Sequence, residues 1–126
     1  MTISLNHTIV PAADNEEAAR FFAAVMGLEF TGPHPYASHF IPVKVNDGLT
    51  LDFMSAPDVP GHHLAFDVDP ATFDGVLARL RERGAPFGDH PARHDNGRVD
   101  IDHPLGDRGI YFADATGNLY EVISTE

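Results

Sequence analysis

Residues 61–69 read GHHLAFDVD, two adjacent histidines followed by an alternating apolar run. Alternation of this kind predicts a β-strand, in which successive side chains point to opposite faces. His62 and His63 therefore cannot share an environment, and one of them is expected to face inward. The dipeptide Asp69-Pro70 directly after the run is typical of a helix start, with an acidic N-cap and a proline at the first helical position.

The residues after Pro70 extend this strand and helix into a complete module. A stripe of apolar residues at helical spacing predicts the helix, and Gly84 is placed to end it. The stripe consists of Phe73, Val76, Leu77 and Leu80. Beyond it we expect a short strand over 86–88 and further strands at Gly109–Ala113 and Leu119–Ser124, the last two joined by a turn.

The first half of the chain repeats this order of elements. Ser4–Val10 is rich in β-forming residues and predicts a strand. Asp14, with Glu17 three residues later, forms the capping box of a helix that Gly27 is expected to end. Further strands are predicted at Leu28–Thr31, about Ser38–Val45 and Leu49–Met54.

The repeated order indicates an internal duplication. We predict an α+β fold in which a β-α-β-β-β module occurs twice, at about 1–56 and at about 61–126, within a single domain spanning 1–126. The second copy carries an additional loop over 88–105.

Composition limits the classes of partner. The chain has 126 residues, no cysteine and a formal net charge of -11. The acidic charge argues against nucleic acid, whose binding normally requires a basic patch. No apolar run approaches the roughly 20 residues of a membrane span, and the lack of cysteine excludes disulfides and thiolate catalysis. We expect a soluble cytoplasmic protein with no nucleic-acid or membrane partner, and a small molecule as its substrate or ligand.

The duplication places polar residues at equivalent points of the two modules. His7 and His63 open the two first strands, while Asp52 and Glu121 lie in the two last strands, each on a largely apolar face. Two imidazoles and one carboxylate form a set that suits Fe(II) or Mn(II). The simpler alternative is that each histidine is an ordinary core or surface residue and that Glu121 points to solvent.

Several stretches carry a resemblance to a known family. They are LNHTIV at 5–10, DNEEAARFFAAVMGLEF at 14–30, HHLAFDV at 62–68 and YFADATGNLYEVIS at 111–124. Together they resemble the vicinal oxygen chelate superfamily, the group of glyoxalases, bleomycin-resistance proteins and extradiol dioxygenases. The resemblance covers nearly the whole chain and implies that the two modules form mixed sheets curled around a cup for a metal or a ligand.

The resemblance also implies roles for individual residues. His7, His63 and Glu121 correspond to the metal ligands, with Fe(II) or Mn(II) favoured and Zn(II) or Ni(II) as alternatives. The fourth corner, a glutamate in glyoxalase I, is Asp52, whose shorter side chain favours, over coordination, either a catalytic role as proton acceptor or a role as hydrogen-bond partner of a metal ligand. Tyr111 matches a tyrosine that hydrogen-bonds substrate in ring-cleaving relatives, although a strand tyrosine often only packs.

Two further features near this site have open interpretations. Arg108 is a candidate for neutralising a substrate anion, with an ordinary charge at the rim as the alternative. Pro91 and Asn96-Gly97 argue against a helix in the additional loop, so we expect a solvated loop, with a lid over the site as the alternative. The loop contains His90, His94 and His103 together with Asp89, Asp95, Asp100 and Asp102.

Two functions follow from these expectations. The first is a divalent-metal-dependent enzyme of glyoxalase or dioxygenase type that acts on a small oxygenated or aromatic metabolite. The second is a metal-free protein of bleomycin-resistance type that binds and sequesters an antibiotic. The presence of His7, His63 and Glu121 together favours the enzyme. A homodimer is a further implication of the resemblance.

Overall fold

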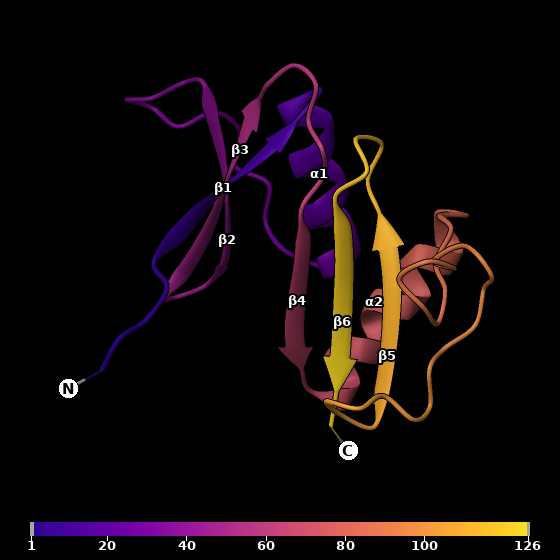
Figure 1. The fold of residues 1–126 in the computed structure, drawn as a ribbon. Coiled ribbons are helices and arrows are strands. Elements are labelled where there is room, and N and C mark those ends of the chain that lie inside the picture. Colours follow the sequence, from indigo (N-terminus) through magenta and orange to yellow (C-terminus); the bar gives the residue numbers. More distant parts are fainter. Residues whose placement is uncertain (1, 126) are drawn as a thin grey trace. The chain divides into compact units, whose positions relative to one another are not determined.

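The computed structural model describes residues 2–125, which form two helices and six strands (Figure 1). The chain divides into two compact units, with the division between Gly61 and His62. Each unit contains a strand, a helix and two further strands in that order, which confirms the predicted α+β fold class. No helix within residues 2–125 is long and apolar enough to cross a membrane.

The first unit consists of β1 (His7–Ala12), α1 (Asn15–Met26), β2 (Phe40–Asn46) and β3 (Leu49–Ser55). Its sheet has the order β1-β3-β2, with β1 parallel and β2 antiparallel to β3. A parallel pair requires a long crossover connection, and α1 and β2 lie within it. The unit is therefore a small mixed sheet with one accompanying helix.

Local sequence determines where α1 begins and ends. The Asp14 carboxylate accepts the backbone N–H of Glu17 at 3.2 Å, as the capping box predicts. Gly27 follows the helix with φ of 73°, in the left-handed region that favours glycine. The helix packs on one face of the sheet, where the ring centroids of Phe22 and Phe53 lie 5.8 Å apart. The buried side chains of that sheet are Val10, Ala12, Ile41, Val43, Leu51 and Phe53.

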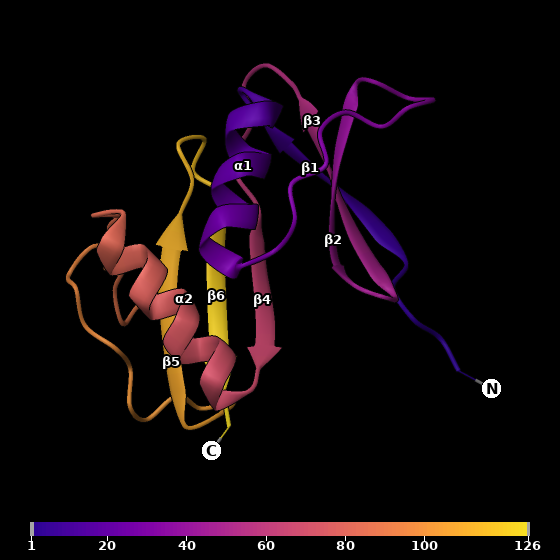
Figure 2. The same ribbon diagram turned by 180° about the vertical axis from the view of Figure 1, so that it is seen from behind.

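The second unit consists of β4 (His63–Val68), α2 (Pro70–Glu82), β5 (Arg108–Ala113) and β6 (Leu119–Ser124). Its sheet has the order β4-β6-β5, again with one parallel and one antiparallel pair. Helix α2 covers one face of this sheet (Figure 2). The buried side chains between them include Phe73, Val76 and Leu80 of α2 and Ile110, Phe112, Tyr120 and Val122 of the sheet.

The two sheets share the same strand register. In the first, His7 pairs with Thr50 and Ile9 with Asp52, whereas in the second His63 pairs with Leu119 and Ala65 with Glu121. In both units the residue two positions after the histidine therefore lies beside the carboxylate. This correspondence is the structural counterpart of the repeat seen in the sequence.

Two expected strands do not form. The segment 28–31 is irregular, because the N–H of Leu28 bonds back to the carbonyl of Ala23 at the end of α1 and Phe30 lies under the guanidinium of Arg20. At 86–88 only Gly88 makes a bridge, to Tyr111, and the preceding Pro86 has no N–H with which to extend a ladder. Each described unit consequently has three strands in place of the predicted four.

Candidate functional site

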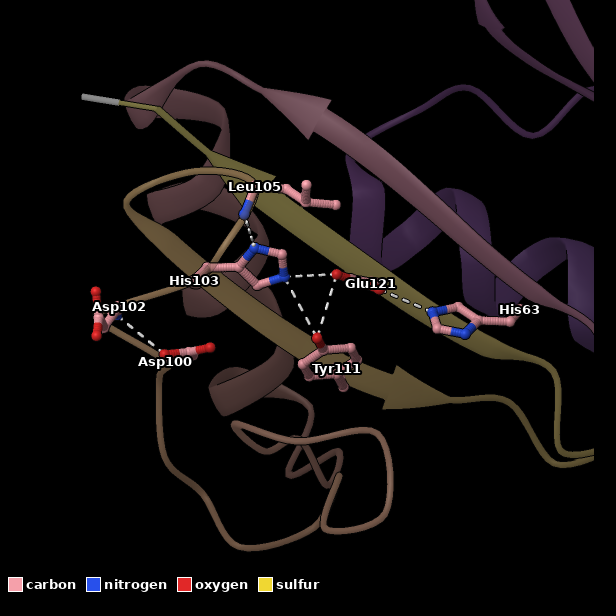
Figure 3. A network of polar contacts seen from close by, with 7 residues as sticks. All are labelled: His63, Asp100, Asp102, His103, Leu105, Tyr111 and Glu121. Atoms are coloured by element: carbon pink, nitrogen blue, oxygen red, sulfur yellow. Dashed lines mark hydrogen bonds and ion pairs between the residues drawn. The ribbon is translucent and has the colours of Figure 1, made fainter.

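Four polar side chains gather on the face of the second sheet that lies opposite α2 (Figure 3). His63, Tyr111 and Glu121 come from β4, β5 and β6. Ala65 of β4 and Tyr111 of β5 pair with Glu121, and His63 lies two residues before Ala65. Strand alternation therefore points the side chains of His63, Tyr111 and Glu121 to one face. The fourth, His103, comes from the loop between α2 and β5. We refer to His63, His103, Tyr111 and Glu121 as the carboxylate cluster.

Glu121 is the centre of this cluster. Its Oε1 lies 2.8 Å from Nε2 of His63, and its Oε2 lies 2.6 Å from Nε2 of His103. The hydroxyl of Tyr111 also donates to Oε2, at 3.2 Å, and lies 3.3 Å from Nε2 of His103. Both carboxylate oxygens are thus hydrogen-bonded, one on the side of β4 and the other on the side of β5 and the loop.

The environment favours the anionic form of Glu121. Burial raises the pKa of this carboxyl group, but hydrogen bonds from His103, His63 and Tyr111 outweigh burial and hold the pKa below its ordinary value of 4.5. Burial and the adjacent charge of Glu121 raise the pKa of Tyr111 to about 12. At neutral pH the cluster therefore contains a carboxylate beside a neutral phenol. Its exposure is uneven, since the His63 side chain is 49% exposed and that of His103 is 2% exposed.

His103 is an exception in a loop that is otherwise largely exposed, as expected. Its imidazole is buried, with Nδ1 accepting the N–H of Leu105 at 3.0 Å and Nε2 facing Glu121. No periodic signal applies to a loop residue, so no sequence pattern distinguishes this histidine from the other two in the loop. Of those, His90 is exposed and His94 is half-buried.

The loop that carries His103 is tied to the sheet. Gly88 exchanges two backbone hydrogen bonds with Tyr111, and Asp100 exchanges two with Gly109, so the loop pairs with β5 at two points. The N–H of Asp107 bonds to the carbonyl of Ser124 at 2.9 Å. These contacts hold the loop as a structured part of the unit.

A turn between β5 and β6 positions the start of β4, the strand that carries His63. The Asp114 carboxylate accepts backbone N–H groups from Thr116, Gly117 and Asn118, and the Asn118 Oδ1 accepts the N–H of His62 at 2.8 Å. The carbonyl of His62 accepts the N–H of Leu119 at 2.7 Å. The turn thereby joins β4 to β6 immediately before His63. The side chain of His62 is exposed and takes no part in the cluster.

The remaining predicted site residues lie outside the cluster. His7 and Asp52 belong to the first unit, where the register places both on the face opposite the buried core. His7 is exposed and its Nδ1 lies 2.8 Å from Oδ1 of Asn6, while Asp52 is half-buried. The structure thus brings together His63, Tyr111 and Glu121 from the predicted set.

Arg108 lies on the opposite face of β5 from Tyr111. Its Nη1 donates to Oδ1 of Asp74 at 2.9 Å, and its guanidinium stands 4.2 Å from the ring centroid of Phe73. Both partners are on α2. This placement gives Arg108 a role in joining α2 to the sheet and does not support substrate binding at the carboxylate cluster.

The donor atoms of the cluster meet part of the needs of a divalent metal. Imidazole nitrogen and carboxylate oxygen are ligands that first-row metals take, and His63 and Glu121 present such atoms side by side. Within residues 2–125, no three His, Asp or Glu side chains are already arranged to hold an ion. His63 and Glu121 therefore fit as part of a ligand set that needs at least one further donor.

The fold is that of a known superfamily. The model of the Glyoxalase/Bleomycin resistance protein/Dioxygenase superfamily matches residues 4–122, and the chain belongs to this superfamily. The resemblance found in the sequence is thereby confirmed.

Several solved structures are similar to this chain in fold and sequence. Oxidase ChaP-H2 is 34% identical with a TM-score of 0.86, covering 100% of this chain and 96% of its own. Oxidase ChaP-H1 is 35% identical with a TM-score of 0.84, covering 99% and 98%. Lactoylglutathione lyase from Agrobacterium tumefaciens shares the fold at 22% identity and a TM-score of 0.70, covering 96% and 92%. A search of curated proteins gave no significant match.

Proposed function

We propose that this protein is a divalent-metal-dependent oxidase or oxygenase that acts on a small oxygenated, aromatic metabolite. The observation that carries the proposal is the buried, anionic Glu121 with an imidazole beside each oxygen and a phenol at the same point. The oxidase names of two structures more than 30% identical to this chain support oxidation over the lyase chemistry named for a structure that is 22% identical.

The proposed metal ligands are His63 and Glu121 from the second unit and His7 from the first. In His7 the Nδ1 faces Oδ1 of Asn6, which can only accept, so Nδ1 carries the proton and the lone pair of Nε2 is available to an ion. A bound Fe(II) or Mn(II) would act as a Lewis acid and hold substrate oxygens in place. Side chains of the protein itself are proposed to orient the substrate and to accept its proton.

Tyr111 is proposed to orient the substrate. Its pKa of about 12 keeps the phenol protonated at neutral pH, so it is a hydrogen-bond donor. In the described structure its proton points to Oε2 of Glu121, and a substrate oxygen placed beside the carboxylate could accept the same proton. Asp52 of the first unit is proposed as the proton acceptor for the substrate, consistent with its half-buried position on the face that also carries His7.

A second candidate function is metal-free binding of a small molecule. The observation favouring it is that both oxygens of Glu121 are already satisfied by His63, His103 and Tyr111, so the cluster is closed without a metal. A buried carboxylate with complete hydrogen bonding needs no ion to remain stable. In this case the half-exposed His63 would contact the ligand directly. For either function we propose that the protein is a homodimer, and its molar mass measured by light scattering tests this.

Metal titration distinguishes the two functions. Protein purified without chelator or polyhistidine tag is titrated with Mn(II) and Zn(II) in a calorimeter, as wild type, His7→Ala, His63→Ala and His62→Ala. We expect one bound ion per chain, lost in His7→Ala and His63→Ala and retained in the matched control His62→Ala, whose side chain lies outside the cluster. Absence of binding in the wild type would favour the metal-free function.

A further inference from the structure

We propose that His103 is a positioning residue. Its imidazole is a fixed hydrogen-bond donor to Oε2 of Glu121 and is not itself a metal ligand. The inference rests on the proposed function, since it assigns which atoms of the cluster remain for the ion. Four observations carry it: the proton arrangement of the imidazole, its burial against the sheet, the structured loop that delivers it, and the unequal use of the two Glu121 oxygens.

The first observation concerns which imidazole nitrogen carries the proton. Nδ1 of His103 accepts the backbone N–H of Leu105 at 3.0 Å, so this nitrogen must keep its lone pair. The proton of the neutral ring therefore resides on Nε2, which lies 2.6 Å from Oε2 of Glu121. An Nε2 that donates a proton cannot offer a lone pair to a metal, and reversing the arrangement would break the bond to Leu105.

This proton arrangement originates in a local sequence motif. His103 is followed by proline, and the same His-Pro-x triplet occurs at 34–36 and 90–92. In all three triplets the third residue donates its backbone N–H to Nδ1 of the histidine, at 3.0 to 3.1 Å. Short side chain to backbone bonds of this i to i+2 type form without tertiary contacts. The triplet thus sets the tautomer of His103 before the ring meets Glu121.

The second observation is that the imidazole has no room to turn away. It lies over Gly109 of β5, and a Cβ at that position would stand 2.5 Å from Cδ2 and 3.1 Å from Cγ of His103. His103 is 5% exposed overall. The ring is thus held at Nδ1 by Leu105, at Nε2 by Glu121 and across its plane by the strand.

The third observation is that the loop itself is anchored. Asp100 pairs with Gly109 on one side of His103, and Gly106 packs on Ile123 on the other, where a Cβ would stand 2.5 Å from Cγ2 of Ile123. Anchors on both sides fix the backbone from which the imidazole projects. The loop acts as a support for the carboxylate.

The fourth observation is the asymmetry of Glu121. Oε2 receives Nε2–H of His103 and the hydroxyl of Tyr111, while Oε1 faces His63 alone. His63 is half-exposed, and within residues 2–125 its Nδ1 has no hydrogen-bond partner, so this ring can exchange its tautomer when an ion arrives. The cluster therefore separates a fixed pair, His103 and Oε2, from an adaptable pair, His63 and Oε1.

The test uses proton-detected nitrogen NMR of the imidazoles, with and without Zn(II). In the metal-free protein we expect His103 as the Nε2–H tautomer with unprotonated Nδ1, and on Zn(II) addition we expect this state to persist while His63 loses its Nε2 proton. Loss of the His103 Nε2 proton on metal binding would overturn the inference. If Zn(II) does not bind, the proposed function fails, and the metal-free spectrum still decides whether His103 is the fixed donor.

The Zn(II) affinities of three variants test the proposal quantitatively. His103→Leu removes the donor, and we expect Zn(II) affinity to fall about 10- to 100-fold, the usual effect of removing a partner of a metal ligand. His103→Gln restores a side-chain N–H and should recover most of that loss. His90→Leu is the matched control, because His90 makes the same His-Pro-x bond on an exposed stretch of the loop. Equal losses in His103→Leu and His103→Gln would assign the effect to packing and contradict the proposal.

Discussion

Replacing Gly109 by alanine tests how tightly His103 is held. The added methyl group would stand 2.5 Å from Cδ2 of His103, closer than non-bonded carbon atoms approach. The imidazole cannot swing away cheaply, because Leu105 binds Nδ1 and Glu121 binds Nε2. Either the strand and loop separate or the imidazole leaves Glu121.

The expected cost is moderate. Overpacking of this kind costs about 1–3 kcal/mol, and loss of the bond to the charged Glu121 costs about 1.5–3 kcal/mol if the ring moves instead. Alanine in a strand recovers about 0.5–1 kcal/mol relative to glycine. The variant should therefore be about 1–2 kcal/mol less stable than the wild type.

Urea unfolding followed by circular dichroism measures this change, and the imidazole NMR signals of His103 report whether the ring has moved. Gly75→Ala is the control in the same unit, since its Cβ would meet only the flexible end of Arg79 and helical alanine is favoured over glycine. We expect Gly75→Ala to be as stable as the wild type or more stable. Equal stability of the two variants with unchanged His103 signals would refute the packing argument.

Three further predictions concern the second unit. Asp114→Asn presents an amide N–H to the buried hydroxyl of Tyr120 and should lower the free energy of unfolding by about 2–4 kcal/mol in urea, with Tyr120→Phe costing less. The pKa of Tyr111 is about 12 in the folded protein and 10.0 ordinarily, so the phenol's contribution to the free energy of unfolding is complete below pH 10.0 and is lost as the pH rises toward 12. Comparing the pH dependence of unfolding in the wild type and in Tyr111→Phe measures this contribution. Arg108→Ala should lower the free energy of unfolding by about 1–2 kcal/mol through its contact with Phe73, without changing metal affinity in calorimetry; weaker metal binding would contradict its placement.

Much of the fold follows from local sequence. The capping residues Asp14 and Asp69 fix both helix starts, and alternation in β4 fixes which histidine can face the carboxylate. The two expected strands that do not form are the short segments 28–31, where the N–H of Leu28 bonds back to Ala23, and 86–88, where Pro86 has no N–H to pair. Local sequence patterns thus predict the helices and the longer strands correctly, but not the two short strands.

The candidate site was predictable only where strands supply it. Alternation places His63, Tyr111 and Glu121 on one face, and it also places Arg108, three residues before Tyr111, on the other. His103 lies in a loop, where no period relates a residue to a face. Its proton arrangement is nevertheless local, since the His-Pro-x triplet is visible in the sequence, whereas its contact with Glu121 depends on tertiary structure.

The two copies of the repeat have diverged at the positions that decide their chemistry. In the second sheet the residue beside Glu121 is the small Ala65, and the neighbouring His63 reaches the carboxylate at 2.8 Å. In the first sheet the equivalent neighbour of Asp52 is the bulky Ile9, and the carboxylate is one methylene shorter. There the histidine bonds instead to the adjacent asparagine.

Within residues 2–125, a carboxylate held by histidine hydrogen bonds thus occurs in the second copy only, and the loop with His103 belongs to that same copy. Substitution of Ile9 by alanine and Asp52 by glutamate reproduces in the first sheet the side-chain sizes around Glu121. We expect this double variant still to bind one Zn(II) ion per chain in calorimetry, because His7 is a proposed ligand of the ion at Glu121 and within residues 2–125 no loop histidine is bonded to Asp52 as His103 is to Glu121. A second Zn(II) ion bound by the double variant would show that strand side chains alone make the carboxylate a ligand, without the loop and His103.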